Sequence, residues 1–257
     1  MKNYALITGA SSGIGLAMAE IFAHHTTNLV LVARSIATLK KMKSDLEKKY
    51  GIVVHILEKD LAREESPKEI YDFTVDKNIH IEYLVNNAWF WDYGPFVDSE
   101  LQRDQDMIQV NIGALTMLTR YFVESMKKHN SGKILNVAST AAFQPWPYMA
   151  VYFASKAYVS SFWLALSKEV EKYGITVTTL YPGPTQSNFA KNAKASSVKI
   201  FGWKLPTSHQ VAQFAYEHMM KGKKIAIHGF ANRLLVWITK FLPMKILLNM
   251  MEIALKK

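Results

Sequence analysis

The stretch "TGASSGIG", Thr8–Gly15, follows the apolar run "YALIT" at residues 4–8 and leads into a segment with helical periodicity. Its three glycines allow a tight turn, close approach of the backbone to a pyrophosphate, and a helix N-terminus whose free N–H groups favour an anion. The order of strand, glycine loop and helix predicts a dinucleotide-binding unit, with a purely structural turn as the alternative. The loop's cofactor contacts are expected from Gly9, Ser11, Ser12, Gly13, Ile14 and Gly15.

Short apolar runs recur along the chain and predict the fold. Most are apolar on both faces, which is typical of strands covered by helices on both sides. Helical periodicity separates them, and Gly174 is a predicted helix stop. The alternation predicts an α/β fold, a Rossmann-like doubly wound parallel sheet of about seven strands with helices on both faces, in a single domain spanning residues 1–257. Beyond residues 4–8, the predicted strands are 28–33, 52–57, 81–86, 133–139, 175–183 and 224–229.

Composition narrows the class of protein. A chain of 257 residues with 49% hydrophobic residues is long enough to build a full core without disulfides. The sequence has no cysteine, which excludes disulfides and thiolate metal ligands and fits a reducing compartment. No metal site is expected. The first apolar stretch is too short for a signal peptide, and no uncharged run is long enough to span a membrane, so a cytoplasmic protein is expected.

The net charge of +10 is confined to the C-terminal part of the chain. Residues 1–186 contain 19 basic and 19 acidic residues, whereas residues 187–257 contain 12 basic residues and two acids, Glu217 and Glu252. This asymmetry suggests attraction to an anionic membrane surface, an acidic substrate or nucleic acid, and the alternative is a solvated lysine-rich surface. Nucleic acid is disfavoured, because bulky aliphatic runs interrupt the basic residues.

Two segments break the alternation of strands and helices. Residues 186–207 have no sustained period, which predicts a substrate lid or a partly disordered segment. Residues 231–257 form a basic, apolar extension in which Pro243 splits any helix into halves too short to cross a bilayer. One interpretation is peripheral association with an anionic membrane, and the other is a subunit interface or packing against the body. The side chains that would insert are Leu234, Leu235, Trp237, Ile238 and Phe241.

The end of the second predicted strand, "LVARS", distinguishes two dinucleotides. A site for NAD usually places an acid there for the ribose hydroxyls, whereas a site for NADP needs a cation for the 2′-phosphate. Ala33 stands where the acid would be, and Arg34 offers a planar, permanently charged donor. The sequence therefore favours NADP(H) over NAD(H), unless Arg34 merely packs or forms an ion pair at the surface.

The segment "YFASK" places Tyr152 and Lys156 four residues apart on one helical face. Ser139 ends the fifth predicted strand, and Asn111 lies in the helix expected before it. A tyrosine and a lysine at this spacing are common by chance. The pair becomes informative only with these neighbours.

With these motifs the chain resembles the short-chain dehydrogenase/reductase family over most of its length. The matching pieces occur in the family's order: "TGASSGIG", "KDL" with Asp60, "NNA" at 86–88, "VNIGA", "NVAS", "YFASK" and "YPGP" followed by "TQS". The resemblance implies an oxidoreductase that interconverts a carbonyl and an alcohol on an apolar or aromatic substrate. It also implies a homodimer or homotetramer.

The resemblance implies a role for each catalytic residue. Tyr152 is the expected proton donor to the carbonyl oxygen, with its pKa lowered by Lys156 and by the oxidised nicotinamide. Ser139 is expected to hold the substrate oxygen, Lys156 the nicotinamide ribose, and Asn111 a water that relays protons to Lys156.

The resemblance also implies cofactor contacts beyond the glycine loop. Asp60 is expected at the adenine and Asn87 at the adenosine ribose. Pro182, Gly183 and Thr185 belong to the segment expected at the nicotinamide carboxamide.

Aromatic residues mark where the sequence departs from the family. Trp89 follows "NNA", where the family usually has glycine, so the resemblance does not predict the cofactor geometry near Asn87. An aromatic rim would suit an apolar substrate. The alternative to an enzyme is a catalytically silent dinucleotide sensor or scaffold. In that case Trp89 and Trp146 block the cleft. The predicted substrate-pocket residues are Trp91, Tyr93, Phe143, Trp146 and Tyr148.

Overall fold

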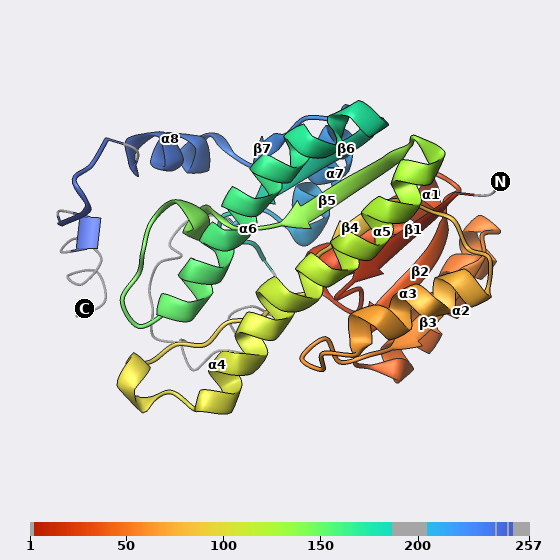
Figure 1. Cartoon of the computed structure of the whole chain (residues 1–257), viewed down its shortest axis with the longest axis horizontal. Coiled ribbons are helices and arrows are strands. Elements are labelled where there is room, and N and C mark those ends of the chain that lie inside the picture. The colour runs from red at the N-terminus through yellow and green to blue at the C-terminus, as the bar shows by residue number, and fades with distance from the viewer. Residues whose placement is uncertain (1–2, 187–204, 240, 246, 249–257) are drawn as a thin grey trace.

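The computed structural model describes residues 3–186, 205–239, 241–245 and 247–248 (Figure 1). Most of the predicted lid at 186–207 and the end of the extension at 231–257 therefore lie outside the described residues. At the two ends of the predicted lid, Gln186 and Thr207 form an isolated parallel bridge.

The described residues form a seven-stranded, all-parallel sheet in the order β3-β2-β1-β4-β5-β6-β7. The order reverses beside β1, between β1 and β4, which is where doubly wound sheets open a crevice at the carboxyl ends of their strands. The predicted fold class is therefore confirmed. The strands are β1 Tyr4–Thr8, β2 Asn28–Ala33, β3 Val54–Glu58, β4 Ile81–Asn86, β5 Gly132–Val137, β6 Ile175–Tyr181 and β7 Ile225–Ile227.

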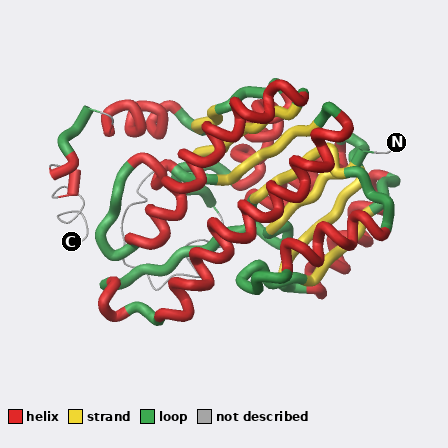
Figure 2. Tube along the Cα trace, viewed as in Figure 1, coloured by secondary structure: helices red, strands yellow, loops and turns green. Residues whose placement is uncertain are grey.

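Helices cover both faces of the sheet (Figure 2). They are α1 Gly13–His24, α2 Ile36–Tyr50, α3 Ser66–Asp76, α4 Leu101–Ile108, α5 Leu115–His129, α6 Ala150–Val170, α7 Ser208–Met220 and α8 Phe230–Thr239. Short helical turns are η1 Phe96–Asp98, η2 Gln109–Ala114, η3 Thr140–Phe143 and η4 Glu171–Tyr173.

The alternation of side chains along each strand divides the core into two. Ala5 and Ile7 of β1 point into a core shared with α1, α2 and α7, whereas Leu6 points into a second core with α3, α5 and α6. Strands between two such layers must be apolar on both faces, which explains the apolar runs of the sequence.

Local signals position the helices. Ser35 accepts a hydrogen bond from the Thr38 N–H at the start of α2, and Thr207 forms a capping box with Gln210 at the start of α7. Gly174 adopts the left-handed conformation after η4, which confirms the predicted helix stop. The fifth strand ends earlier than predicted, at Val137, because Ser139 instead accepts a hydrogen bond from the Ala141 N–H and starts η3.

Candidate active site

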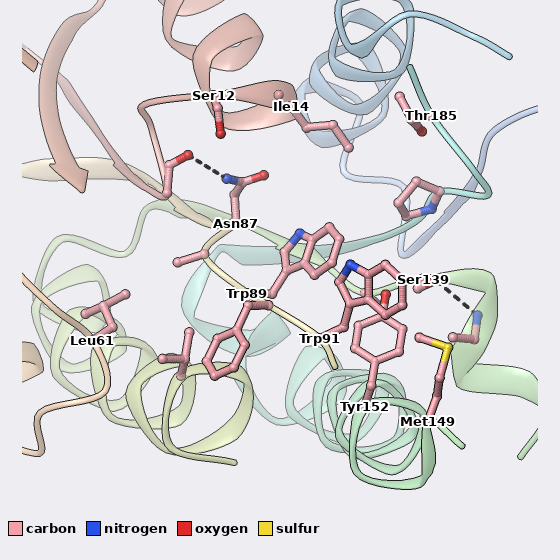
Figure 3. A pocket seen from close by; sticks show the side chains of 18 of the residues that line it. Ser12, Ile14, Leu61, Asn87, Trp89, Trp91, Ser139, Met149, Tyr152 and Thr185 are labelled. Atoms are coloured by element: carbon pink, nitrogen blue, oxygen red, sulfur yellow. Dashed lines mark hydrogen bonds between the residues drawn. The ribbon is translucent and has the colours of Figure 1, made fainter. Parts of the chain in front are cut away.

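A cavity of about 970 Å³ lies at the carboxyl ends of the strands. The loops after β1, β2, β3, β4, β5 and β6 line it, and α8 contributes to one side. Figure 3 shows Ser12 and Ile14 of the glycine loop at one end, Tyr152 at the other, and Trp89 and Trp91 between them. One elongated space therefore connects the predicted phosphate loop with the predicted catalytic residues.

The glycine loop is held by close backbone contacts. Gly9 has a φ of +63°, and a Cβ there would lie 2.9 Å from the Ala88 Cα. A Cβ on Gly15 would lie 2.4 Å from both the Gly9 carbonyl oxygen and the Asn87 amide nitrogen. The Asn87 side chain donates hydrogen bonds to the carbonyl oxygens of Thr8 (2.9 Å) and Gly9 (3.2 Å). The structure thus shows Asn87 supporting the loop, while its contact with an adenosine ribose stays a prediction.

Cations and an acid follow β2 and β3 along the cavity. Arg34 is exposed at the cavity, and its side chain has no hydrogen bond or ion pair with the residues that the structure describes. Ala33 before it is buried. Lys59, also in the lining, is paired with Glu69 at 2.7 Å, and the Asp60 carboxylate accepts the Ala62 N–H at 3.1 Å. Of the two cations, Arg34 and Lys59, Arg34 is therefore the one that is available to bind an anion.

Ser139 and Tyr152 line the other end of the cavity, and Lys156 is buried next to Tyr152 outside the lining. Burial raises the pKa of Tyr152 to about 12, and a hydrogen bond with Ser139 acts in the opposite direction. Lys156 Nζ donates a hydrogen bond to the Val137 carbonyl oxygen at 3.0 Å, and burial lowers the pKa of this lysine to about 7. α6 supplies the tyrosine and the lysine, and the end of β5 supplies the serine.

Among the chain's own residues the pKa of Tyr152 is raised by burial. The resemblance implies that Lys156 and the oxidised nicotinamide together lower this pKa, and that lowering stays a prediction. Tyr152 and Lys156 are both enclosed: Lys156 is 1% exposed, and burial lowers its pKa as well.

Asn111 lies in η2, a π-helical turn between α4 and α5. Its side-chain oxygen accepts the Phe90 N–H at 3.1 Å, and its amide group donates to the Phe90 carbonyl oxygen and to Ser155 Oγ, both at 3.0 Å. The side chain therefore joins the loop after β4 to α6. Its expected role in holding a water stays a prediction.

The family model described as short chain dehydrogenase matches residues 3–197. The chain belongs to the short-chain dehydrogenase/reductase family. It is 34% identical over 186 residues to 17-beta-hydroxysteroid dehydrogenase type 3 of Mus musculus, covering 71% of this chain and 60% of the relative. The chain thus spans less than two thirds of that relative's length.

Two further comparisons cover nearly the whole chain. Very-long-chain 3-oxoacyl-CoA reductase of Anas platyrhynchos is 28% identical over 255 residues, 96% of this chain and 78% of the relative. The structure of a short-chain dehydrogenase from Sphingobium yanoikuyae in complex with NADPH superposes with a TM-score of 0.82 at 27% identity, covering 92% of each chain.

The five aromatic residues that the sequence predicts in the substrate pocket divide into two groups. Trp91, Tyr93 and Trp146 line the cavity, and the ring centroids of Trp91 and Tyr152 are 6.5 Å apart. Phe143 and Tyr148 do not line it. Phe143 packs against Tyr181 (4.8 Å), which does not line the cavity either, and Tyr148 packs against the lining residue Tyr93 (5.9 Å). Their contact with substrate stays a prediction.

Sequence reasoning missed several lining residues. Asn232 and Leu235 of α8 reach the cavity, and a Cβ on Gly183 would lie 2.4 Å from the Asn232 side-chain oxygen. Arg103 of α4 also lines the cavity, where its guanidinium pairs with Asp92. The sequence offers no family motif at these positions. The only signal for α8 was the spacing of its apolar residues.

Proposed function

We propose that the protein is an NADP(H)-dependent oxidoreductase that interconverts a carbonyl and an alcohol on an apolar substrate. The observation that supports this best is the meeting of Ser139 and Tyr152 at one end of a cavity whose other end is the glycine loop. A dinucleotide bound along this cavity would bring its nicotinamide towards the tyrosine.

The residues present fit such a cofactor. The absence of side chains at Gly9 and Gly15 lets the loop pack against Asn87 and Ala88. The segment from Gly9 to Gly13 lines the cavity at the start of α1, where its backbone could bind a pyrophosphate. Arg34, whose guanidinium has no hydrogen bond or ion pair with the described residues, suits a 2′-phosphate. We therefore infer that NADP(H) is preferred, with Asp60 and the segment Pro182 to Thr185 as further contacts.

Proton transfer depends on the chain's own residues. When bound, the nicotinamide supplies or accepts the hydride. Tyr152 is buried and protonated in the neutral pH range, which is the form needed to donate a proton to a carbonyl oxygen. Ser139 hydrogen-bonds the same hydroxyl and would fix the substrate oxygen beside it. In the reverse direction Tyr152 must act as a base, so a cation close to it is required.

Lys156 is the residue able to supply that cation. Its ammonium lies 5.8 Å from the centre of the Tyr152 ring. With a pKa of about 7 it is partly neutral at neutral pH, so it can pass a proton as well as hold charge. We infer that Lys156 both orients the nicotinamide ribose and returns a proton to Tyr152.

The substrate class follows from the cavity wall. Trp91 and Trp146 present flat apolar surfaces, and Met149 adds a flexible one beside Tyr152 (Figure 3). The relatives named for hydroxysteroid and 3-oxoacyl-CoA chemistry also point to bulky, apolar carbonyl compounds. We propose a steroid-like or long-chain acyl carbonyl substrate.

The test compares Tyr152→Phe with Tyr158→Phe, a second tyrosine of α6 whose hydroxyl pairs with Thr116 at 3.2 Å. NADPH oxidation is followed with steroid ketones and 3-oxoacyl thioesters. Tyr152→Phe is expected to keep NADPH binding and to lose turnover by at least about a hundredfold, while Tyr158→Phe stays near the wild type. Equal turnover in wild type and Tyr152→Phe would remove the tyrosine from the mechanism.

One observation favours a second candidate, a catalytically silent dinucleotide sensor. The Trp89 ring lies over the Lys156 ammonium at 4.9 Å and against Tyr152 at 5.8 Å, and Lys156 does not line the cavity. Tight NADPH binding without reduction of either substrate class would support the sensor. Turnover of either class would exclude it.

A further inference from the structure

α8 presents an apolar face to solvent. Phe230, Leu234 and Trp237 follow one another at spacings of four and three residues, which places them on one side of α8, and Phe241 follows in the turn after the helix. They are 80%, 45%, 60% and 69% exposed. The rings of Trp237 and Phe241 pack against each other at 4.9 Å. We call these four residues the α8 face. Contiguous apolar surface of this kind marks an interaction site.

The opposite side of α8 is attached to the active site. Val236 is buried, and Asn232 and Leu235 line the cavity. The Asn232 amide donates to the His228 carbonyl oxygen at 2.7 Å, and Arg233 Nε donates to the Ile227 carbonyl oxygen at 3.0 Å. The helix is therefore fixed to the body on one side, and Figure 1 shows it projecting at the end of the molecule away from α2 and α3.

Charge identifies the kind of partner. From the start of α8 to Glu252 the sequence contains no acid, and it contains Arg233, Lys240 and Lys245. A second copy placed on the α8 face would bring two such basic segments together, and like charges there oppose association. An anionic lipid surface complements the charge and accepts the apolar side chains. None of the helices that the structure describes is long and apolar enough to cross a membrane.

We propose that the α8 face docks the protein on an anionic lipid surface. Docking in this orientation brings α8 against the lipid, and Leu235 lines the cavity from the side of that helix turned away from the face, so about 10 Å, one helix diameter, separates the lipid from the cavity. An apolar carbonyl compound dissolved in the lipid could then enter the cavity without crossing water. This route, unlike the docking itself, rests on the proposed function.

Docking is tested with the full chain and two kinds of vesicle, phosphatidylcholine alone and phosphatidylcholine with phosphatidylserine. Co-sedimentation is expected with the anionic vesicles and is expected to weaken as salt is added. The double variant Leu234→Gln/Trp237→Gln should lower the partition coefficient at least about tenfold. Leu164→Gln on α6 is the matched control, because this leucine is 40% exposed and lies outside the α8 face; it should bind as the wild type does.

Several outcomes would overturn docking. Docking is refuted if the wild type does not bind anionic vesicles, or if Leu164→Gln loses as much vesicle binding as the double variant. It is also refuted if the wild type is a dimer that the double variant converts to monomers while vesicle binding persists. The last result would assign the face to a second copy. Because binding is measured without substrate or NADPH, its failure leaves the proposed reaction intact, and failure of the reaction leaves docking intact.

The route has its own measurement. The double variant should reduce a short, water-soluble ketone as fast as the wild type and a vesicle-borne ketone several-fold more slowly. Equal rates on the vesicle-borne ketone would refute entry from the lipid.

Discussion

The ring of Trp89 lies over the ammonium of Lys156, 4.9 Å from ring centroid to nitrogen. A cation over an indole is attracted by the ring's negative face, more strongly when both are removed from water. Here Lys156 is almost fully buried, and it does not belong to the cavity lining although it lies next to Tyr152. The residue predicted to hold the nicotinamide ribose is thus covered by the residue that departs most from the family pattern.

This contact predicts the effect of replacing the indole. Trp89→Gly restores the residue usual in the family and uncovers the lysine, so NADPH should bind several-fold more tightly. Trp89→Phe keeps an aromatic cover and should stay near the wild type. Fluorescence titration with NADPH measures both. Weaker binding in Trp89→Gly would show instead that the indole forms part of the cofactor site.

The position of Trp89 also shows where sequence reasoning ends. The glycine loop and the strands could be predicted, because close backbone approach and burial on both faces leave patterns in neighbouring residues. The sequence identified Trp89 as a departure but placed its effect near Asn87. Whether an indole turns towards Asn87 or Lys156 depends on packing against α6, which no local pattern records.

The remaining differences have the same origin. α8 reaches the cavity through Asn232 and Leu235, far along the chain from every motif, so only the folded chain reveals them. The prediction for the pKa of Tyr152 rests on two charges, Lys156 and the oxidised nicotinamide. The effect of the chain's own residues on this pKa is determined by enclosure on all sides, which is a property of the tertiary structure.

Burial of Lys156 should make stability depend on pH. The pKa of this lysine falls from 10.5 to about 7 on folding, so between these values the unfolded chain binds the extra proton. The free energy of unfolding should therefore rise as pH increases from about 7 to 10.5, by up to about 1.4 kcal/mol per pH unit from this group, and this gain is lost again as pH falls from 10.5 to about 7.

Lys156→Met removes the titrating amine and isolates that contribution. Urea unfolding of wild type and variant at a series of pH values gives the difference in free energy. The free energy of unfolding of the wild type relative to that of the variant should increase with rising pH. A difference independent of pH would show that the lysine is not held neutral.

Arg34 should act on one dinucleotide only. Its guanidinium has no partner among the described residues, so Arg34→Ala removes a contact with a 2′-phosphate and little else. NADPH affinity should fall by about ten- to a hundredfold, as expected for a charge-assisted hydrogen bond. NADH affinity should be unchanged. Calorimetric titration with both cofactors decides this, and an equal loss for both would place Arg34 in a structural role.

Asn111 is predicted to position the loop that holds Trp89 and Trp91. Its side chain makes two hydrogen bonds with the Phe90 backbone and one with Ser155, all buried or half-buried. Asn111→Ala leaves these groups without partners and should cost about 1–3 kcal/mol of stability, measured by denaturant unfolding. If the residue also relays protons, kcat should fall more than KM rises, whereas loosening of the loop alone should raise KM.

Ser139 should tune the acid–base behaviour of Tyr152. Its hydrogen bond lowers the tyrosine pKa against the effect of burial, so Ser139→Ala should raise that pKa further. Alcohol oxidation needs the deprotonated tyrosine, and its rate profile should therefore shift to higher pH in the variant. Ser139→Thr keeps the hydroxyl and should restore the profile. The measurement is kcat for oxidation against pH, and an unshifted profile in Ser139→Ala, even with a lower maximal rate, would mean that the serine holds substrate without influencing the proton on Tyr152.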